Sequence, residues 1–510
     1  MRWRIAGLAT VAAFLVLIGR FWHPVYAFTS FLQLDAADDQ VKIASLHEVP
    51  IYVYRNTGGY DGQYYAQIAY HPLLDSAELS PSTVDNLAYR ARRILPCALS
   101  WLLAAGQTAL IVHVYSLLNV GFWLALAALL WRILGISGPR AWMAWVGVLF
   151  SAGAIESVRF ALPDLPAATL AAGALWAADR NRGGWASGLM AAASLSRETT
   201  LAAVPGLWRR PWLSAANARR TAAAVVPIAG WLAYIRWRLG SGDPQWNNFD
   251  WPFAGLVGKG ADCIGAFAGT TDTLLVAATL LATLGLGVQT VYIAARPQPA
   301  DRWWCVGAAY ALMLALLGAP VWEGFPGASM RVLLPLTIAF NVLVVRRKSA
   351  LAWLLAGNLG VAAGLFILST PHTDPREIAA ARQRGSSIIV RVGDGWAGRE
   401  HRLSHVWSWC SGHGRLSIEA WPRDRRPLEL TFGLHSLDER NVSIRDRGRL
   451  VWRGKVGPDL VFHTLPVTLD SGRAELDFSS DRPPQHESPA LGGRLLAFEI
   501  YDLRIAVPAR

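Results

Sequence analysis

Long apolar runs, separated by short polar links, dominate the first 370 residues of the chain. Each run is close to the roughly 20 residues that a helix needs to cross the hydrocarbon core of a bilayer, once tilt and frayed ends are allowed. The runs lie at 5–18, 106–134, 141–155, 161–178, 222–235, 271–294, 303–317, 330–345 and 351–368. This pattern predicts a polytopic α-helical membrane domain over residues 1–370.

The basic residues between the runs predict the orientation, because arginine and lysine collect in cytoplasmic loops. The links that this rule places inside carry Arg132, Arg140, Arg180, Arg182, Arg209, Arg210, Arg219, Arg220, Arg296, Arg302, Arg346, Arg347 and Lys348. The first run follows Arg2 and Arg4 without a convincing cleavage site, so we interpret it as a signal anchor with a cytoplasmic N-terminus. The opposite side then receives loops at about 22–93, 236–270 and 320–329, and everything after about residue 371.

One segment, 185–208, must enter and leave on the same side for this topology to hold. It carries Arg197-Glu198 in its middle, which favours a broken or re-entrant helix that faces protein or water. In the alternative topology 94–105 becomes a span and 185–208 crosses once. Both versions agree on the first loop and on the C-terminal side, and they predict about 9–11 spans.

After residue 371 the pattern changes to short alternating runs, which Gly, Pro, Asp and Asn clusters separate. The clearest lie at 416–418, 428–432, 474–478 and 496–500. Alternation with a period of two, broken by turns, predicts an antiparallel β-sandwich within 371–510. Its tryptophans could stack on sugar rings or fill the core, and core filling is the better expectation for most of them. They are Trp396, Trp407, Trp409 and Trp421.

Composition narrows the class of protein. Of 510 residues, 53% are hydrophobic and only 16% are charged, which excludes a disordered chain and a coiled coil. The net charge of +12 would suggest nucleic acid as the partner of a soluble protein, but here cytoplasmic loops account for much of it, so no nucleic-acid partner is expected. Four cysteines show no zinc or redox spacing; Cys263 and Cys410, both expected outside, could in principle pair.

The loop after the first run contains the most informative segment, 58–72. A diglycine precedes Asp61, and a helix that begins there places Tyr65, Ile68 and Ala69 on one stripe. Two interpretations stay open at this point. Asp61 could simply cap an amphipathic surface helix, or the lone carboxylate could take part in chemistry.

The run Asp61-Gly62-Gln63-Tyr64-Tyr65-Ala66-Gln67-Ile68-Ala69 resembles the first exoplasmic loop of the GT-C glycosyltransferase superfamily. It looks closest to the bacterial members and the mannosyltransferase-like branch, although it has Asp-Gly where other branches have Asp-Glu or Asp-x-Asp. The resemblance covers 58–96 well and the rest of the membrane domain loosely. The C-terminal region looks like the carbohydrate-binding sandwiches appended to bacterial sugar-transfer proteins.

The resemblance implies inverting transfer of a sugar from a polyprenyl-phosphate donor to an acceptor hydroxyl. The reaction would take place on the periplasmic face of a bacterial inner membrane, with the C-terminal domain also periplasmic. The implied partners are the lipid-linked donor, a lipid or glycan acceptor and membrane lipids. No cofactor is specified, although some relatives use a divalent cation, and no His, Asp or Glu spacing along the chain specifies a metal.

This chemistry gives Asp61 a role, because a positioned carboxylate can orient the attacking hydroxyl or accept its proton. The departing phosphate needs cations or hydrogen-bond donors beside it. The candidates for substrate binding are Tyr60, Gln63, Tyr64, Tyr65, Arg90, Arg93, Glu156, Asp164, Arg197, Glu198 and Arg331.

Structural explanations stay open for several of these candidates. Arg90 and Arg93 could reach ordinary lipid phosphates, and Arg331 could anchor a helix end. Glu156 could pair with Arg159, and Arg197 with Glu198. The acidic cluster Asp35, Asp38 and Asp39 is better explained as a solvated charge run than as the catalytic group.

Two other functions compete with sugar transfer. A transporter or flippase of lipid-linked glycans usually shows internal repeats and paired broken helices, and the sequence offers neither a repeat nor a second interrupted segment. A membrane-anchored subunit that binds polysaccharide would have no need for buried Arg197-Glu198 or an acidic first loop. Sugar transfer therefore ranks first.

Overall fold

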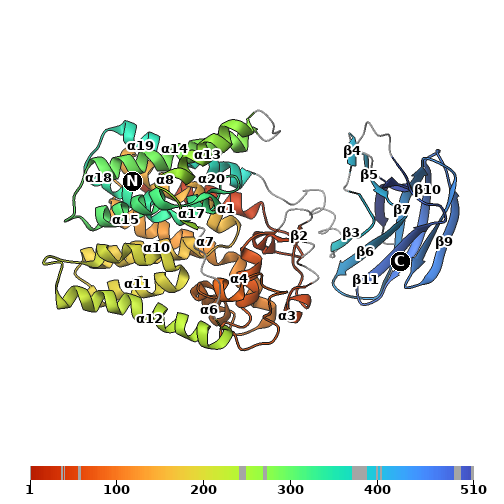
Figure 1. The fold of residues 1–510 in the computed structure, drawn as a ribbon, viewed down its shortest axis with the longest axis horizontal. Coiled ribbons are helices and arrows are strands. Elements are labelled where there is room, and N and C mark those ends of the chain that lie inside the picture. Colours follow the sequence, from red (N-terminus) through yellow and green to blue (C-terminus); the bar gives the residue numbers. More distant parts are fainter. Residues whose placement is uncertain are drawn as a thin grey trace. The chain divides into compact units, whose positions relative to one another are not determined.

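A computed structural model describes residues 2–35, 38, 41–54, 59–240, 248–267, 273–369, 387–397, 400–402, 405–486 and 495–506. The chain forms two compact units, Met1–Thr373 and Asp374–Arg510 (Figure 1). The boundary lies three residues after the one expected from the change of pattern at 370/371. The first unit is helical and the second is built from strands.

The helices of unit 1 follow the apolar runs. Their bounds are α1 Arg2–Gly19, α6 Ile94–Leu103, α7 Thr108–Leu134, α8 Pro139–Leu149, α9 Ala152–Arg159, α10 Asp164–Asp179, α11 Gly183–Ser196, α12 Ala215–Leu239, α13 Ala254–Ala266, α14 Thr273–Ala295, α15 Arg302–Leu316, α16 Ala319–Trp322, α17 Ser329–Val332, α18 Leu334–Arg346, α19 Leu351–Gly357 and α20 Val361–Ser369. Local signals set several ends: α7 stops at Gly135, which takes a left-handed φ of 57°, and α8 starts with a proline, whose missing N–H costs nothing in a first turn.

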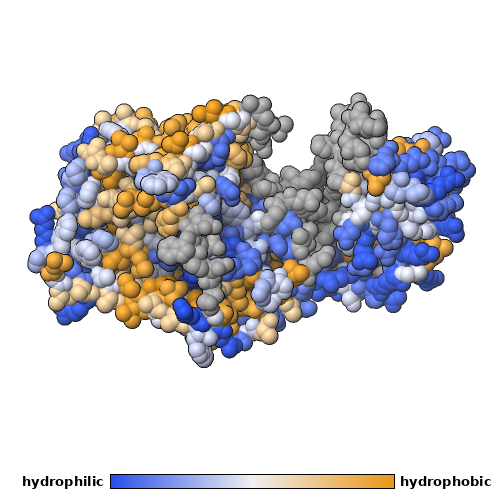
Figure 2. All heavy atoms as spheres, viewed as in Figure 1, coloured by the Kyte–Doolittle hydropathy of each residue, from blue (hydrophilic) through white to orange (hydrophobic). Residues whose placement is uncertain are grey.

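Three helices, α1, α7 and α14, are long and apolar enough to cross a membrane, and two bent pairs raise the number to as many as five over the described residues. The pairs are α8 with α9, bent by 42°, and α19 with α20, bent by 41°. Hydrophobic residues cover much of the visible face of unit 1, whereas unit 2 is mainly hydrophilic (Figure 2). The expected total of 9–11 spans stays a prediction. The α6 helix has ten residues, about 15 Å, so by itself it is too short to span.

The segment expected to be broken is interrupted at the predicted place. The α11 helix ends at Ser196, Arg197 is extended with φ −155° and ψ 123°, and a 3₁₀ helix, η2 (Glu198–Leu207), follows. The change of direction at the Arg197-Glu198 step projects these two side chains away from the helix axis.

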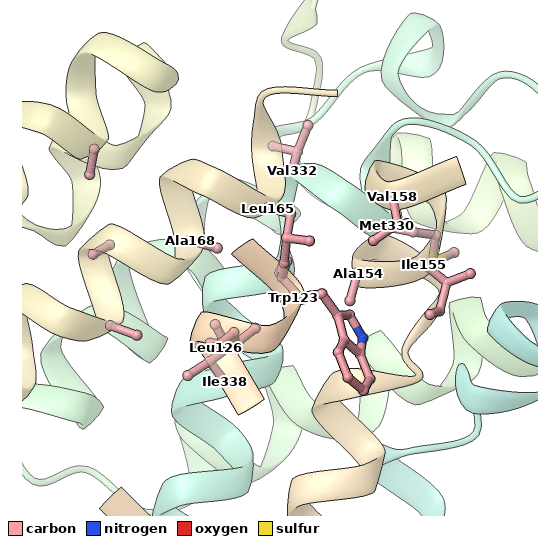
Figure 3. Close-up of a cluster of buried hydrophobic side chains, with 14 of the residues drawn as sticks. Trp123, Leu126, Ala154, Ile155, Val158, Leu165, Ala168, Met330, Val332 and Ile338 are labelled. Atoms are coloured by element: carbon pink, nitrogen blue, oxygen red, sulfur yellow. The ribbon is translucent and has the colours of Figure 1, made fainter. Parts of the chain in front are cut away.

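The core of unit 1 lies where α7, α9, α10, α17 and α18 meet (Figure 3). Trp123, Leu126, Ala154, Ile155, Val158, Leu165, Ala168, Met330, Val332 and Ile338 pack there. A Cβ on Gly153 would lie 2.1 Å from the carbonyl oxygen of Met330, so only glycine lets α9 approach the backbone of α17 this closely. This contact brings Glu156, one turn further along α9, beside Arg331.

The first loop folds onto this helical core. It contains η1 (Thr29–Leu32), α3 (Ala44–His47), α4 (Gly62–Ile68), α5 (Leu87–Arg90) and the parallel pair of β1 (Leu34–Asp35) and β2 (Val53–Tyr54). Arg159, which is buried, donates to the carbonyl oxygen of Ser30 and to the hydroxyl of Tyr54, at 3.0 Å each. The expected alternative of a Glu156–Arg159 ion pair is therefore wrong, because Arg159 anchors the loop instead.

Unit 2 confirms the antiparallel β-sandwich expected from the alternating runs. One sheet has the order β10-β7-β14-β5-β4 and the other β3-β6-β11-β8-β9. The strands are β3 Ser387–Val392, β4 Glu400–Arg402, β5 His405–Cys410, β6 His413–Trp421, β7 Arg426–Ser436, β8 Arg440–Asp446, β9 Arg449–Val456, β10 Val461–Leu469, β11 Arg473–Ser480, β12 Gln485–His486, β13 Leu495–Leu496 and β14 Phe498–Ala506.

Core filling holds for fewer tryptophans than expected. Trp396 packs against the core of the sandwich; Trp407 and Trp409 lie on the face of β5 opposite the core residue Cys410, where Trp409 is nevertheless buried, at 8% exposed, against His435. Trp421 packs with the guanidinium of Arg423 instead. The four cysteines are free thiols, and Cys97, Cys263 and Cys410 are buried.

Candidate active site

Asp61 stands immediately before α4, in the position of a helix cap, but its carboxylate does not cap the helix. One oxygen lies 2.8 Å from Nη1 of Arg90 and the other 3.2 Å from Nη2 of Arg331. The interpretation of Asp61 as a mere capping residue is therefore wrong. The side chain is 23% exposed, so the carboxylate lies between two arginines and still reaches the surface.

The glycine after Asp61 has a physical reason. A Cβ at Gly62 would lie 2.2 Å from the carbonyl oxygen of Phe160, so only glycine allows α4 to start against the turn between α9 and α10. Tyr65, Ile68 and Ala69, the stripe expected from the sequence, form the fully buried face of this helix and its C-terminal end. The tight fit holds Asp61 above the helices that carry Glu156 and Asp164.

Arg331 is the centre of the cluster. Besides Asp61 it contacts Asp164 at 3.4 Å and Glu156 at 3.8 Å, and its side chain is only 7% exposed. Tyr60 closes one side: its hydroxyl donates to Glu156 at 2.9 Å, its ring stacks on Phe160, and the guanidinium carbon of Arg331 lies 5.5 Å from the ring centroid. Arg331 is thus surrounded by three carboxylates and an aromatic ring and is no simple helix-end anchor.

Arg90 and Arg93 lie next to this cluster, Arg90 as the last residue of α5 and Arg93 just before α6. Arg90 also pairs with Asp85 at 2.8 Å, and its guanidinium lies 5.1 Å from the ring centroid of Tyr64. Arg93 pairs with Glu198 at 3.1 Å and donates to the hydroxyl of Tyr65 at 2.5 Å. Both arginines therefore have protein partners.

The broken helix contributes its two charges separately. Arg197 pairs with Asp164 at 2.9 Å, whereas Glu198 pairs with Arg93. The expected Arg197–Glu198 ion pair is replaced by two pairs with other elements, because the extended backbone at Arg197 sends the two side chains in different directions. These contacts tie η2 to α10 on one side and to the start of α6 on the other.

The structure brings most of the residues singled out in the sequence into one contiguous network. Four arginines face four carboxylates, so 4 − 4 = 0 and the cluster is close to neutral before Asp85 is counted; the eight are Arg90, Arg93, Arg197, Arg331, Asp61, Glu156, Asp164 and Glu198. Burial is uneven: Glu156 and Asp164 are 2% and 1% exposed, against 23% for Asp61 and 27% for Glu198. Asp61 and Glu198 are thus the two carboxylates of the cluster that an incoming ligand can reach, and of these Asp61 is the one paired with Arg331.

Some positions were missed or differ from expectation. Asp85 and Tyr89 were not singled out, yet one pairs with Arg90 and the other accepts a hydrogen bond from Arg93 at 2.7 Å. Within the described part of the chain, Gln63 donates to Asp38 at 2.8 Å and to none of the eight side chains of the network, so its place in the network is not confirmed. Asp38 is therefore held by the protein and is not part of a solvated charge run, while Asp39 lies outside the described residues. The i, i+5 spacing of Asp85 and Arg90 was the only signal available in the sequence.

The residues around Asp61 do not fit a divalent cation. Each of the carboxylates of Asp61, Glu156 and Asp164 already contacts a guanidinium, so arginines occupy the places that a metal ion would take. Within the described ranges, no group of three or more His, Cys, Asp or Glu side chains is arranged to hold a metal ion. The residues around Asp61 therefore do not provide a site through which a metal ion would act.

The arginines decide the ionisation of Asp61. Burial by itself would raise the pKa of this carboxyl, but the charges of Arg331, Arg90 and Arg93 and the hydrogen bond from Arg90 outweigh burial and lower the pKa to about 2. Asp61 is therefore ionised at any physiological pH. While both ion pairs persist it is a weak proton acceptor, suited to orienting a hydroxyl group.

Because Asp61 stays ionised, its ion pairs should contribute equally to the stability of the fold at neutral and mildly acidic pH. The folded pKa of about 2 lies below the ordinary value of 3.8 for an aspartate, so the stabilisation is complete above about pH 4 and is lost only as the pH falls toward 2. It amounts to about 2 kcal/mol. We expect Asp61→Asn to lower the melting temperature of the purified protein equally at about pH 8 and at about pH 5.5. A deficit that shrinks between these two values would contradict the paired, ionised state.

Comparisons with known proteins give only distant likenesses. No family model matches the chain, and no curated protein matches it. Among solved structures, the arabinosyltransferase EmbB from Mycobacterium smegmatis is 12% identical, with a TM-score of 0.28; the match covers 88% of this chain and 62% of EmbB, less than two thirds of its length.

Two smaller proteins match only about a quarter of the chain. A structure described as CBM4 is 11% identical, and TmCBM61 in complex with β-1,4-galactotriose is 10% identical; each covers 24% of this chain, with a TM-score of 0.15, and 86% and 88% of the respective proteins are matched. At such TM-scores none of these likenesses carries an argument about function.

Proposed function

We propose that this protein transfers a sugar from a polyprenyl-phosphate donor to an acceptor hydroxyl, with Asp61 as the carboxylate that orients and deprotonates the acceptor. One observation carries the proposal: Asp61 is a partly exposed, ionised carboxylate held between Arg90 and Arg331. An acceptor hydroxyl needs an anion beside it, and a departing phosphate needs cations beside it. Both requirements are met within one ion-pair cluster.

The reaction balances without a further cofactor. The acceptor oxygen forms a bond to the anomeric carbon, the bond from that carbon to the phosphate oxygen breaks, and configuration inverts. The electron pair leaves with the polyprenyl phosphate, and the proton of the hydroxyl passes to Asp61. No nucleophile–base pair is required, because the lipid phosphate is already a good leaving group.

Donor binding would also raise the pKa of Asp61. The phosphodiester monoanion of the donor competes with the carboxylate for Arg90 and Arg331, because guanidinium groups bind both in the same bidentate manner. Once the phosphate binds these guanidinium groups, the ion pairs that lower the pKa of Asp61 weaken. The carboxylate then becomes a better proton acceptor at the step that needs one.

The other carboxylates of the cluster support this arrangement. Glu156 and Asp164 together hold Arg331, and Glu198 holds Arg93, so both guanidinium groups stay in place when a ligand is absent. Tyr60 and Tyr64, both half-buried, complete the candidate binding surface, whereas Gln63 and Tyr65, which the sequence also suggested, are buried and do not reach it. We further propose that residues 371–510 lie in the periplasm and bind carbohydrate, either the acceptor or the product.

An assay on the purified full chain in lipid vesicles tests the proposal. The vesicles carry polyprenyl-phosphate sugars, one at a time, and receive a mixture of acceptor glycans. A transferase releases free polyprenyl phosphate and forms a new glycosidic bond, detected by mass spectrometry. A flippase instead moves intact donor between leaflets with neither product. Donor movement without release of polyprenyl phosphate would overturn the proposed function.

A further inference from the structure

A second group of charges lies at the other end of the helices that hold the Asp61 cluster. The α10 helix begins with Asp164 in the cluster and ends with Asp179, and the 179 − 164 = 15 steps between them, at 1.5 Å each, separate the two by about 22 Å. The α10, α11 and α12 helices lie side by side (Figure 1), and α18 runs from just after Arg331 to Arg346. The two charged ends are therefore separated by a distance close to the thickness of a bilayer's hydrocarbon core.

Asp179 collects donors from two other helices. Nε of Arg302 lies 3.4 Å away, Nη2 of Arg346 lies 3.0 Å away, and the indole N–H of Trp303 donates at 3.2 Å. Arg302 also donates to the carbonyl oxygens of Gly206 and Trp208, at 2.8 and 3.2 Å. The start of α15 is thus fixed to the loop that follows η2.

That loop, Trp208–Leu213, is held in a defined shape. The amide of Asn217 donates to the carbonyl oxygens of Arg209, Pro211 and Trp212, and its oxygen accepts from Arg220 at 2.7 Å. The guanidinium of Arg209 donates to Asn181, in the turn after α10, at 2.5 Å. The loop therefore presents its side chains from a fixed backbone, beside Asp179.

We call this group the arginine end: Asp179, the loop Trp208–Leu213, Arg220, Arg302 and Arg346. Its charges do not balance, in contrast to the Asp61 cluster. It contains five arginines (Arg209, Arg210, Arg220, Arg302 and Arg346) and one carboxylate, Asp179, so 5 − 1 = +4; Arg302 and Arg346 pair with Asp179. The nearby Asp301 caps the first turn of α15, which lowers the surplus to +3.

The arginine end also exposes apolar side chains next to its charges. Trp208 is 36% exposed, Trp212 is 48% exposed, and Leu213 is fully exposed. Tryptophan prefers the interface between headgroups and hydrocarbon, and arginines beside it attract anionic lipid. A soluble anion would leave the side chain of Leu213 exposed to water, whereas the acyl chain of a lipid would bury it.

We propose that the arginine end binds the phosphate of an anionic phospholipid, with Trp212 and Leu213 inserted beside the lipid's glycerol and acyl chains. Arg209 and Arg220 approach the phosphate, and Arg302 and Arg346 add to its field from their places on Asp179. The inference does not rest on the proposed sugar transfer. It would hold equally if the protein moved lipids without chemistry, because it concerns the opposite end of the helices.

Native mass spectrometry of the detergent-purified full chain tests this site. The protein is titrated with phosphatidylglycerol and, separately, with phosphatidylcholine of the same chain length. We expect tighter binding of phosphatidylglycerol, and a loss of about thirtyfold in its affinity in the double variant Arg209→Gln/Arg220→Gln, at about tenfold per 1.4 kcal/mol and about 1 kcal/mol per arginine. Arg449→Gln/Arg453→Gln, two exposed arginines on β9, is the matched control and should bind as the wild type does.

A third variant separates lipid from soluble anion. Trp212→Ala/Leu213→Ser should weaken phosphatidylglycerol binding while all arginines remain, and inorganic phosphate at millimolar concentration should not displace the lipid. Equal binding of both phospholipids by the wild type, or an unchanged affinity in the arginine double variant, would overturn the proposal. Displacement by inorganic phosphate together with an unaffected Trp212→Ala/Leu213→Ser variant would also overturn it, because the site would then take a free anion. Melting temperatures of all variants confirm that they fold.

Discussion

Replacing Asp61 by asparagine is expected to lower sugar transfer by about 10²- to 10⁴-fold, the usual range for loss of one general acid–base group. Asparagine has nearly the same shape, so the first loop should keep its fold. The amide can neither accept a proton nor stay charged beside Arg90 and Arg331. Release of polyprenyl phosphate from vesicles, measured against donor concentration, gives kcat and KM separately.

Donor affinity provides a second readout that a purely structural role would not move. Since the carboxylate of Asp61 competes with the donor phosphate for two guanidinium groups, Asp61→Asn should bind the donor at least as tightly as the wild type does while it turns over far more slowly. Weaker donor binding in this variant would contradict the competition. Full turnover would remove Asp61 from the mechanism.

The chain offers a close control for this experiment. Asp85 pairs with the same guanidinium of Arg90 at 2.8 Å, but its side chain is 43% exposed, and the ion pairs of the described residues link it to Arg90 and not to Arg331. We expect Asp85→Asn to retain transfer within a fewfold of the wild type. If Asp85→Asn and Asp61→Asn lose activity equally, the effect belongs to Arg90 and not to Asp61.

The second large effect is expected at Arg331. Substitution by glutamine leaves Glu156 without its guanidinium partner, removes one of the two arginines on Asp61, and leaves Asp164 with Arg197 alone. Removing one member of a buried ion-pair network costs about 3–5 kcal/mol, because the remaining charges stay buried and uncompensated. We expect a much lower melting temperature and transfer below detection.

A double variant keeps this prediction testable if Arg331→Gln folds poorly. Arg331→Gln/Glu156→Gln removes one charge of each sign, so part of the lost stability should return, with a coupling of about 1–3 kcal/mol. Transfer should stay absent, because the guanidinium beside Asp61 is still missing. Recovery of both stability and transfer would show that Arg331 matters only for folding.

Arg346→Gln provides the comparison for stability. This arginine also belongs to an ion pair with an aspartate, Asp179, but its side chain is 40% exposed. Pairs this accessible contribute about 0–1 kcal/mol, so the melting temperature should change little. A loss as large as that of Arg331→Gln would mean that burial does not explain the difference between the two sites.

The architecture was largely readable from the order of residues. Apolar runs predicted the positions of the helices, and alternation after residue 371 predicted the strands, since both periodicities are local properties of the backbone. The break at Arg197-Glu198 was also local, because two adjacent charges inside an apolar run cannot remain on a lipid-facing helix. The bends between α8 and α9 and between α19 and α20 were not predicted, so the expectation that the chain has no second interrupted segment, which counted against a transporter, is wrong.

The sequence predicted which residues belong to the candidate site but not which of them contact one another. Loop position, aromatic neighbours and the resemblance selected Asp61 and the charged residues around it. The partners were often misjudged: Glu156 pairs with Arg331 and not with Arg159, and Glu198 pairs with Arg93 and not with Arg197. These partners are far apart in the sequence, and spacing along the chain does not determine which distant elements pack together.

The sequence by itself determined that helices of membrane length precede a β-sandwich, and that one acidic, tyrosine-rich loop follows the first apolar run. Only the tertiary structure decided that Asp61 leaves the cap of α4 for two arginines, one of them 270 residues away. The reason is steric as much as electrostatic. Glycines at 62 and 153 let α4 and α9 approach the backbones of their neighbours, and that close packing puts the charges within reach of one another.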